Sequence, residues 1–178
     1  RTFVEDPMFL GLKGQVYPRL LDDLEELFEG DYIEAILAGS IGWGKSTFAE
    51  IAMCRMIYEV SCYRNPQRAF GLIDGAVIAF INVSVSKSNA EKVVYTGIRS
   101  KLDNSPYFRD VYPIEPNIRS ELRLPNNVWV FPVASDETAV IGYNVFGGVM
   151  DEVNFMDVVE NSKRARGLNS NRYDKATT

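Results

Sequence analysis

Hydrophobic residues along the chain gather in two kinds of segment, short continuous runs and longer stretches with helical spacing. Continuous runs of the length typical of buried strands occupy residues 32–38, 77–83 and 145–150. Apolar residues recur every three or four positions over residues 18–29, 46–60 and 88–102. Strands that alternate with helices in this order predict an α/β domain with an open, mainly parallel sheet and helices on both faces.

Local signals mark where several elements begin and end. Pro18 favours the first turn of the leading helix, and Gly30 stops that helix. Ser88 and Glu91 have the spacing of a capping box, which predicts a helix start at Ser88. Two further apolar runs flank a Pro-Asn-Asn turn, and they predict a small antiparallel hairpin near 119–132.

The length and composition favour a single domain. The chain has 178 residues, of which 46% are hydrophobic, and this is enough for one core with little room for a second. We expect the domain to cover residues 1–160, with the leading helix 18–29 ahead of a core of residues 31–160. Residues 161–178 are polar and basic, and we expect them to form a mobile tail.

Composition also excludes several kinds of chemistry. The chain has no histidine, so histidine acid–base catalysis and histidine metal ligands are ruled out. Cys54 and Cys62 are too few for a metal cluster or a disulfide framework, and Cys54 is expected to be a reduced core residue. The net charge of -5 argues against a protein that coats duplex DNA but allows local contacts with nucleic acid. No apolar stretch approaches the length of about 20 residues that a membrane span needs.

The most specific motif follows the first apolar run. Residues 39–46 read Gly-Ser-Ile-Gly-Trp-Gly-Lys-Ser and match the phosphate-loop pattern G-x-x-x-x-G-K-[S/T] at every fixed position. The run 32–38 is expected to enter the loop as a buried strand, and the helix 46–60 leaves it. A glycine-rich turn that matches by chance is the alternative, and this strand–loop–helix context makes it the weaker one.

The loop residues have expected roles in binding ATP with Mg²⁺. Backbone N–H groups of the loop and of the helix start would hold phosphate oxygens. Lys45 would reach the β- and γ-phosphates, and the Ser46 hydroxyl would ligate Mg²⁺. The residues assigned to nucleotide binding are Gly39, Ser40, Ile41, Gly42, Trp43, Gly44, Lys45, Ser46 and Thr47.

Hydrolysis also needs an acid that organises Mg²⁺ and a base that activates water. Asp151 and Glu152 follow the apolar run 145–150 directly, and we assign Asp151 to Mg²⁺ and Glu152 to the attacking water. A solvated strand end is the alternative for this pair. Asp136-Glu137 follows another apolar run, but Pro132 disfavours a central strand there, so that pair is expected to start a helix.

The order of the segments resembles a known family. The long interval between Lys45 and Asp151 leaves room for an extra strand, and an inserted strand with an adjacent Asp-Glu pair is similar to the additional-strand, catalytic-glutamate division of phosphate-loop ATPases. Within it, most of residues 8–160 resembles the ATPase domain of the large terminase subunit of tailed bacteriophages. The matching segments are Tyr17-Pro18, G-S-I-G-W-G-K-S-T at 39–47, S-V-S-K-S-N-A-E-K at 84–92, N-S-P-Y-F at 104–108, and I-G-Y-N with V-F-G-G-V-M-D-E at 141–152.

This resemblance implies a motor that couples ATP hydrolysis to movement of double-stranded DNA into a procapsid, as one subunit of a homo-oligomeric ring. It implies the portal protein and the small terminase subunit as partners, and the host-cell cytoplasm at the procapsid portal as the location, with no membrane. Gln15 resembles the glutamine that reads adenine in helicase-like motors, with a solvated loop glutamine as the alternative. No nuclease domain follows in this chain, so a fragment or an isolated ATPase domain is expected.

The chain departs from the family pattern in its arginines. Terminases often carry an arginine inside the phosphate loop or ahead of the Asp-Glu strand, where this chain has Ser40, Ile41 and Ile141. The transition-state arginine is thus unassigned, and a ring neighbour can supply it in trans. Candidates in this chain, each with a surface ion pair as the alternative, are Arg99, Arg109, Arg119 and Arg123.

Other functions of a phosphate-loop protein stay open at this point. A helicase-like remodeller would have a second motor lobe in the full-length gene, whereas a terminase would have a downstream acidic nuclease. A phosphate-loop kinase would transfer phosphate to an added acceptor without an effect of DNA. A switch that binds nucleotide without turnover is disfavoured by the Asp-Glu pair.

Overall fold

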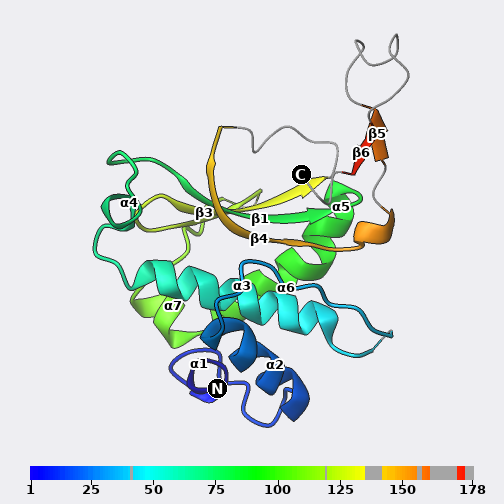
Figure 1. The fold of residues 1–178 in the computed structure, drawn as a ribbon. Coiled ribbons are helices and arrows are strands. Elements are labelled where there is room, and N and C mark those ends of the chain that lie inside the picture. The colour runs from blue at the N-terminus through cyan, green and yellow to red at the C-terminus, as the bar shows by residue number, and fades with distance from the viewer. Residues whose placement is uncertain (41, 119, 135–141, 156–157, 161–171, 175–178) are drawn as a thin grey trace.

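The computed structural model describes residues 1–40, 42–118, 120–134, 142–155, 158–160 and 172–174 (Figure 1). The helices are α1 (Thr2–Glu5), α2 (Pro18–Glu29), α3 (Lys45–Ser61), α4 (Pro66–Ala69), α5 (Lys87–Ala90), α6 (Thr96–Asn104) and α7 (Pro106–Asp110), with a π-helical turn η1 (Glu91–Tyr95) and a 3-10 turn η2 (Val153–Phe155). The strands are β1 (Ile78–Ser84), β2 (Leu122–Leu124), β3 (Val128–Ala134), β4 (Asn144–Met150), β5 (Val158–Glu160) and β6 (Arg172–Asp174).

The main sheet has four strands in the order β2-β3-β1-β4. β1 lies in the middle and pairs in parallel with β3 on one side and with β4 on the other. β2 pairs antiparallel with β3, which confirms the hairpin predicted near 119–132. The α/β class and the open, mainly parallel sheet are therefore confirmed. β5 and β6 form a separate antiparallel pair.

The described helices cover one face of this sheet. Figure 1 shows α2, α3, α6 and α7 below the strands. Ile78 and Phe80 of β1 face these helices and are almost completely buried, as is Ile57 of α3. Their neighbours on the opposite face, such as Ile81 and Trp129, are only half-buried. For that second face, the expected layer of helices stays a prediction.

The two helices closest to the phosphate loop follow the sequence pattern. α2 has the predicted bounds of the leading helix, because Leu20, Leu21 and Leu24 form one buried stripe on it. α3 extends the predicted helix 46–60 by one residue at each end. Cys54 lies on α3 with its side chain completely buried, as expected of a core residue.

The predicted strand at residues 32–38 is wrong. Among the described residues the segment pairs with no strand, and most of its apolar side chains face solvent, with Ile33 fully exposed and Ile36 84% exposed, while Leu37 is partly buried against the core. A continuous apolar run becomes a buried strand only where a neighbouring strand supplies hydrogen bonds and packing. β4 ends the four-stranded sheet, and this run does not join it.

The expectation that Pro132 disfavours a central strand is also wrong, since β3 includes Pro132 and lies between β2 and β1. The Ile78 amide donates to the Asn127 carbonyl, so Asn127 and every second residue after it turn their backbone groups toward β1. The nitrogen of Pro132 therefore faces the side of β2. That strand ends where Leu122 pairs with Val130, so Pro132 disrupts no ladder bond.

Three smaller expectations concern the helix near Ser88, the pair Asp136-Glu137 and the tail. The helix expected to start at Ser88 begins at Lys87, because the Ala90 amide already donates to the Ser86 carbonyl. Asp136-Glu137 lies outside the described residues. Most of the predicted tail 161–178 does as well, although β6 lies within it and pairs with β5.

Candidate nucleotide-binding site

The phosphate loop makes two turns that require glycine. Gly42 has φ 86° and Gly44 has φ 95°, a left-handed conformation that side chains with a Cβ rarely adopt. A Cβ at Gly44 would also lie 2.8 Å from Cδ1 of Leu20, so the Leu20 side chain would have to shift. The first turn of α2 therefore packs against the end of the loop.

The loop leads into the N-terminus of α3, which is 17 residues long. The Phe48 amide donates to the Gly44 carbonyl (2.9 Å), so the helical bonding starts there and the amides of Lys45, Ser46 and Thr47 precede it. No side chain caps this end at Gly44. A helix start with unpaired N–H groups and a positive dipole end favours an anion, and phosphate is the anion that the sequence motif predicts.

The side chain of Lys45 folds back over the loop. Its Nζ donates to the carbonyl oxygens of Gly39 (2.7 Å) and Ser40 (2.9 Å). The Trp43 ring lies against Gly39, since a Cβ on Gly39 would be 3.6 Å from Cγ of the ring. Ile41 lies outside the described residues. The loop is thus held together by its own lysine and tryptophan.

Asp151 and Glu152 lie where β4 ends. The Asp151 amide continues the parallel ladder with a 2.8 Å bond to the Val83 carbonyl. Glu152 then turns the chain with φ 55°, and its amide donates to Oδ1 of Asp151 (3.0 Å). A left-handed glutamate costs conformational energy, and such residues gather at functional sites. The bond to Oδ1 fixes the Asp151 carboxylate, which is half-buried, while Glu152 is exposed.

The loop and this acidic pair lie at the same end of the molecule. Met56 of α3 packs on Gly147 of β4, where a Cβ would be 2.8 Å from its Sδ. Lys45 lies about 16 Å back along α3 from Met56. Asp151 lies about 13 Å further along β4 from Gly147. α3 and β4 run in opposite directions. The start of α3 and the end of β4 therefore lie at the same edge of the sheet, on the right in Figure 1.

The residues at this edge fit a magnesium nucleotide. Mg²⁺ is usually held by one or two protein oxygens, with substrate phosphates and water as its other ligands. Ser46 and Asp151 can supply such oxygens. Among the described residues no group of three or more acidic, cysteine or histidine side chains could hold a metal by itself. A metal at this edge would therefore need the phosphates of the nucleotide as further ligands.

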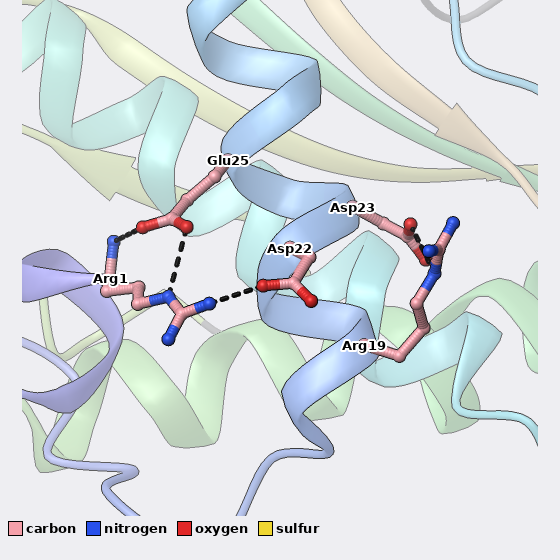
Figure 2. Close-up of polar contacts among 5 residues, drawn as sticks. All are labelled: Arg1, Arg19, Asp22, Asp23 and Glu25. Carbon is pink, nitrogen blue, oxygen red and sulfur yellow. Dashed lines mark hydrogen bonds and ion pairs between the residues drawn. The ribbon is translucent and has the colours of Figure 1, made fainter.

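Three of the acidic residues on α2 pair with arginines. Figure 2 shows Asp22 and Glu25 turned toward Arg1, and Asp23 toward Arg19. The Arg1–Glu25 and Arg19–Asp23 ion pairs both measure 3.0 Å. Asp22, Asp23 and Glu25 are thus each paired with an arginine.

The candidate arginines are engaged as well. Arg99 pairs with Asp103, and Arg109 with its neighbour Asp110. Arg123 pairs with Glu121 and stacks over the Trp129 ring at 4.1 Å. Arg119 lies outside the described residues. The structure therefore assigns no transition-state arginine.

Gln15 and Leu20 lie on either side of the start of α2. Gln15 is exposed and donates only a long bond (3.5 Å) to the Gly11 carbonyl. It precedes α2, whose Leu20 contacts Gly44. Sequence reasoning missed Leu20 as a support of the loop. Its place on the apolar stripe of α2 predicts burial, but which partner it meets depends on how α2 packs.

Comparisons with known proteins agree with the loop geometry. The chain belongs to the protein family described as "Uncharacterized protein MJ0330, N-terminal P-loop domain", which matches residues 19–175. No curated protein and no solved structure matches the chain. None of the helices that the structure describes is long and apolar enough to cross a membrane.

Proposed function

Starting from membership in this P-loop family, we propose that the protein is a Mg²⁺-dependent ATPase that drives translocation of double-stranded DNA, as the motor domain of a viral terminase does. The observation that supports hydrolysis best is the placement of Lys45 and the Asp151-Glu152 pair at one edge of the sheet. The family membership supports a P-loop domain, and the terminase function is supported by the sequence resemblance.

Each residue has a proposed task at this edge. Lys45 and the amides at the start of α3 bind the phosphates, and Ser46 and Asp151 hold the metal. Bound Mg²⁺ neutralises charge on the transferring phosphate. Glu152 orients and deprotonates the attacking water. The Gln15 side-chain amide pairs with N6 and N7 of adenine, because α2, which follows Gln15, contacts the loop.

A kinase is the weaker candidate because of Glu152. A kinase directs the phosphate to an acceptor and needs to exclude water, whereas an exposed carboxylate next to the metal-binding acid activates water. The homo-oligomeric ring, the portal protein and the small terminase subunit are proposed as partners on the resemblance. A ring would also provide the cation in trans, since the described candidates Arg99, Arg109 and Arg123 are held in ion pairs within the chain.

Trp43 offers a direct test of nucleotide binding. In a Trp129→Phe background its emission reports on the loop, and we expect ATP with Mg²⁺ to change it. Lys45→Ala should abolish this change.

Glu152→Gln should still bind nucleotide but lose turnover by about a hundredfold or more. Glu29→Gln, an exposed acid at the end of α2, is the matched control and should behave as the wild type. Normal hydrolysis by Glu152→Gln would remove Glu152 as the base.

The DNA-motor part needs a separate measurement. Turnover per subunit should rise with protein concentration, as subunits assemble, and rise again when double-stranded DNA is added. An isolated nanomolar monomer with full activity would contradict the ring. Transfer of phosphate to an added acceptor, with no effect of DNA, would favour the kinase.

A further inference from the structure

The pairing of β4 with β1 contains one irregularity. Ala79 pairs with Val145, but the next residue of β1, Phe80, pairs with Gly147. Phe146 is therefore an extra residue in β4, a β-bulge, and it has no partner in the ladder. Regular pairing resumes after it, up to Val83 opposite Met150, and the Asp151 amide then bonds to Val83.

This bulge decides which face of the sheet Asp151 occupies. Side chains alternate between the two faces along a strand, so one extra residue reverses the faces of all residues beyond it. The exposure of β4 shows the reversal. Val145 and Phe146 are both exposed, and beyond them Gly147, Val149 and Asp151 are the half-buried positions. These three are on the face that α3 covers. In an unbulged ladder Asp151 would be on the opposite face.

Two contacts keep Phe146 out of the ladder. The position opposite Phe80 is crowded, since even a Cβ on Gly147 would lie 2.8 Å from Sδ of Met56. Phe146 could therefore take the place of Gly147 only if the Met56 side chain moved. Its ring packs instead on Phe70, at the end of α4, with the ring centroids 4.2 Å apart.

We propose that the Phe146 bulge, held by Phe70, is the positioning device that turns Asp151 toward the start of α3. Phe70 and Phe146 are then positioning residues for the metal site, and they act through the register of β4. This inference rests on the proposed function for the role of Asp151, whereas the register itself is measurable without nucleotide.

The test measures hydrogen exchange of the Asp151 amide, which is protected only while it bonds to Val83. Phe70→Ala should lower this protection by about tenfold. Without the ring contact, nothing at Phe70 opposes the unbulged register, in which Phe146 pairs with Phe80. Deletion of Phe146 removes the extra residue but leaves all later pairings unchanged. The deletion should therefore keep the protection, and in that background Phe70→Ala should have no further effect. Phe9→Ala, which removes a ring that contacts Phe3, Tyr58 and Tyr107, is the control for lost aromatic packing.

The result would overturn the proposal if Phe70→Ala left the Asp151 amide fully protected, or if the folded Phe146 deletion lost the protection. Should the deletion fail to fold, Phe70→Ala decides, since Phe70 lies outside β4. The role of Asp151 is read separately, from the gain in AMP-PNP affinity that Mg²⁺ produces. A glycine inserted between Gly148 and Val149 should abolish this gain, as should Asp151→Asn. A full gain in Asp151→Asn would contradict the proposed metal role and leave the register result standing.

Discussion

Lys45 and Gly39 are joined by a 2.7 Å hydrogen bond, in which the lysine amine donates to the glycine carbonyl across the phosphate loop. The amine that is proposed to bind phosphate is thus engaged by the loop itself in this structure. Binding of a nucleotide requires an exchange of this bond, and of the bond to Ser40, for bonds to phosphate oxygens. The cost of this exchange is small, because the carbonyl oxygens are neutral, whereas a bond to phosphate joins two ionised groups and is stronger.

This relationship predicts a change in the loop even without nucleotide. Lys45→Ala removes both bonds, so the segment from Gly39 to Trp43 should become more mobile. In the Trp129→Phe background, acrylamide should quench Trp43 more strongly in Lys45→Ala than in the parent. Lys101→Ala is a control, since it removes a lysine that pairs with Glu50 away from the loop. Equal quenching in the Lys45 variant and the parent would show that the lysine does not hold the loop.

A second prediction concerns the glycine at the end of the loop. Gly44→Ala should cost about 1–2 kcal/mol of stability, because alanine is strained at φ 95°. It should also weaken nucleotide binding, since its Cβ would displace Leu20 or the loop. Leu20→Ala in the same chain should restore part of the binding. Gly71→Ala is the matched control, with φ 70° and no atom within 4 Å of its Cβ. If both glycine variants bound nucleotide alike, the contact with Leu20 would have no role.

The exposed segment before the loop gives a third prediction. Ile33→Lys should leave the midpoint of urea unfolding almost unchanged, because Ile33 makes no buried contact. Phe80→Ala should cost about 3–5 kcal/mol, because Phe80 is only 1% exposed in the middle of the sheet. A loss of more than about 2 kcal/mol in Ile33→Lys would mean that residues 32–38 are buried in solution, as their sequence suggested.

A fourth prediction follows from the burial of Cys54. Burial raises the pKa of the Cys54 thiol from 9.0 to about 12. The unfolded chain therefore loses this proton at a lower pH than the folded chain, so stability should fall as the pH rises from 9 toward 12. The slope approaches about 1.4 kcal/mol per pH unit. Unfolding midpoints at several pH values, compared with those of Cys54→Ala, measure it.

The burial of Cys54 and the exposure of Cys62 should also be visible in thiol labelling. Cys62 is exposed, so a thiol reagent at pH 8 should modify Cys62 rapidly and leave Cys54 unmodified until the protein unfolds. Peptide mapping of the labelled protein identifies the site. Fast labelling of Cys54 in the native protein would contradict its burial.

The loop motif and the helices around it were predictable because their signals are local. Gly42, Gly44 and Lys45 have fixed spacing, and the bounds of α2 and α3 follow from helical periodicity and from Pro18. The hairpin of β2 and β3 was predictable as well, since its turn is made by Asn126 and Asn127, both with positive φ. These features depend on residues close together in the chain.

The failures concern pairing between distant segments. An apolar run such as 32–38 specifies a preference for a strand, but a strand exists only if another one lies beside it, and no local residue decides that. The same holds for Pro132, whose effect depends on where its neighbour β2 ends.

By itself, the sequence determined the P-loop and the helix that follows it. It also determined the alternation of strands and helices that gives a mainly parallel sheet, and the presence of two acids at the end of a strand. Only the tertiary structure decided which side of the sheet those acids occupy, because the alternation of β4 is reset by Phe146, and this bulge depends on Met56 and Phe70 in other elements. Local chain geometry is encoded in neighbouring residues, whereas register is a choice between whole-strand alternatives that only packing distinguishes.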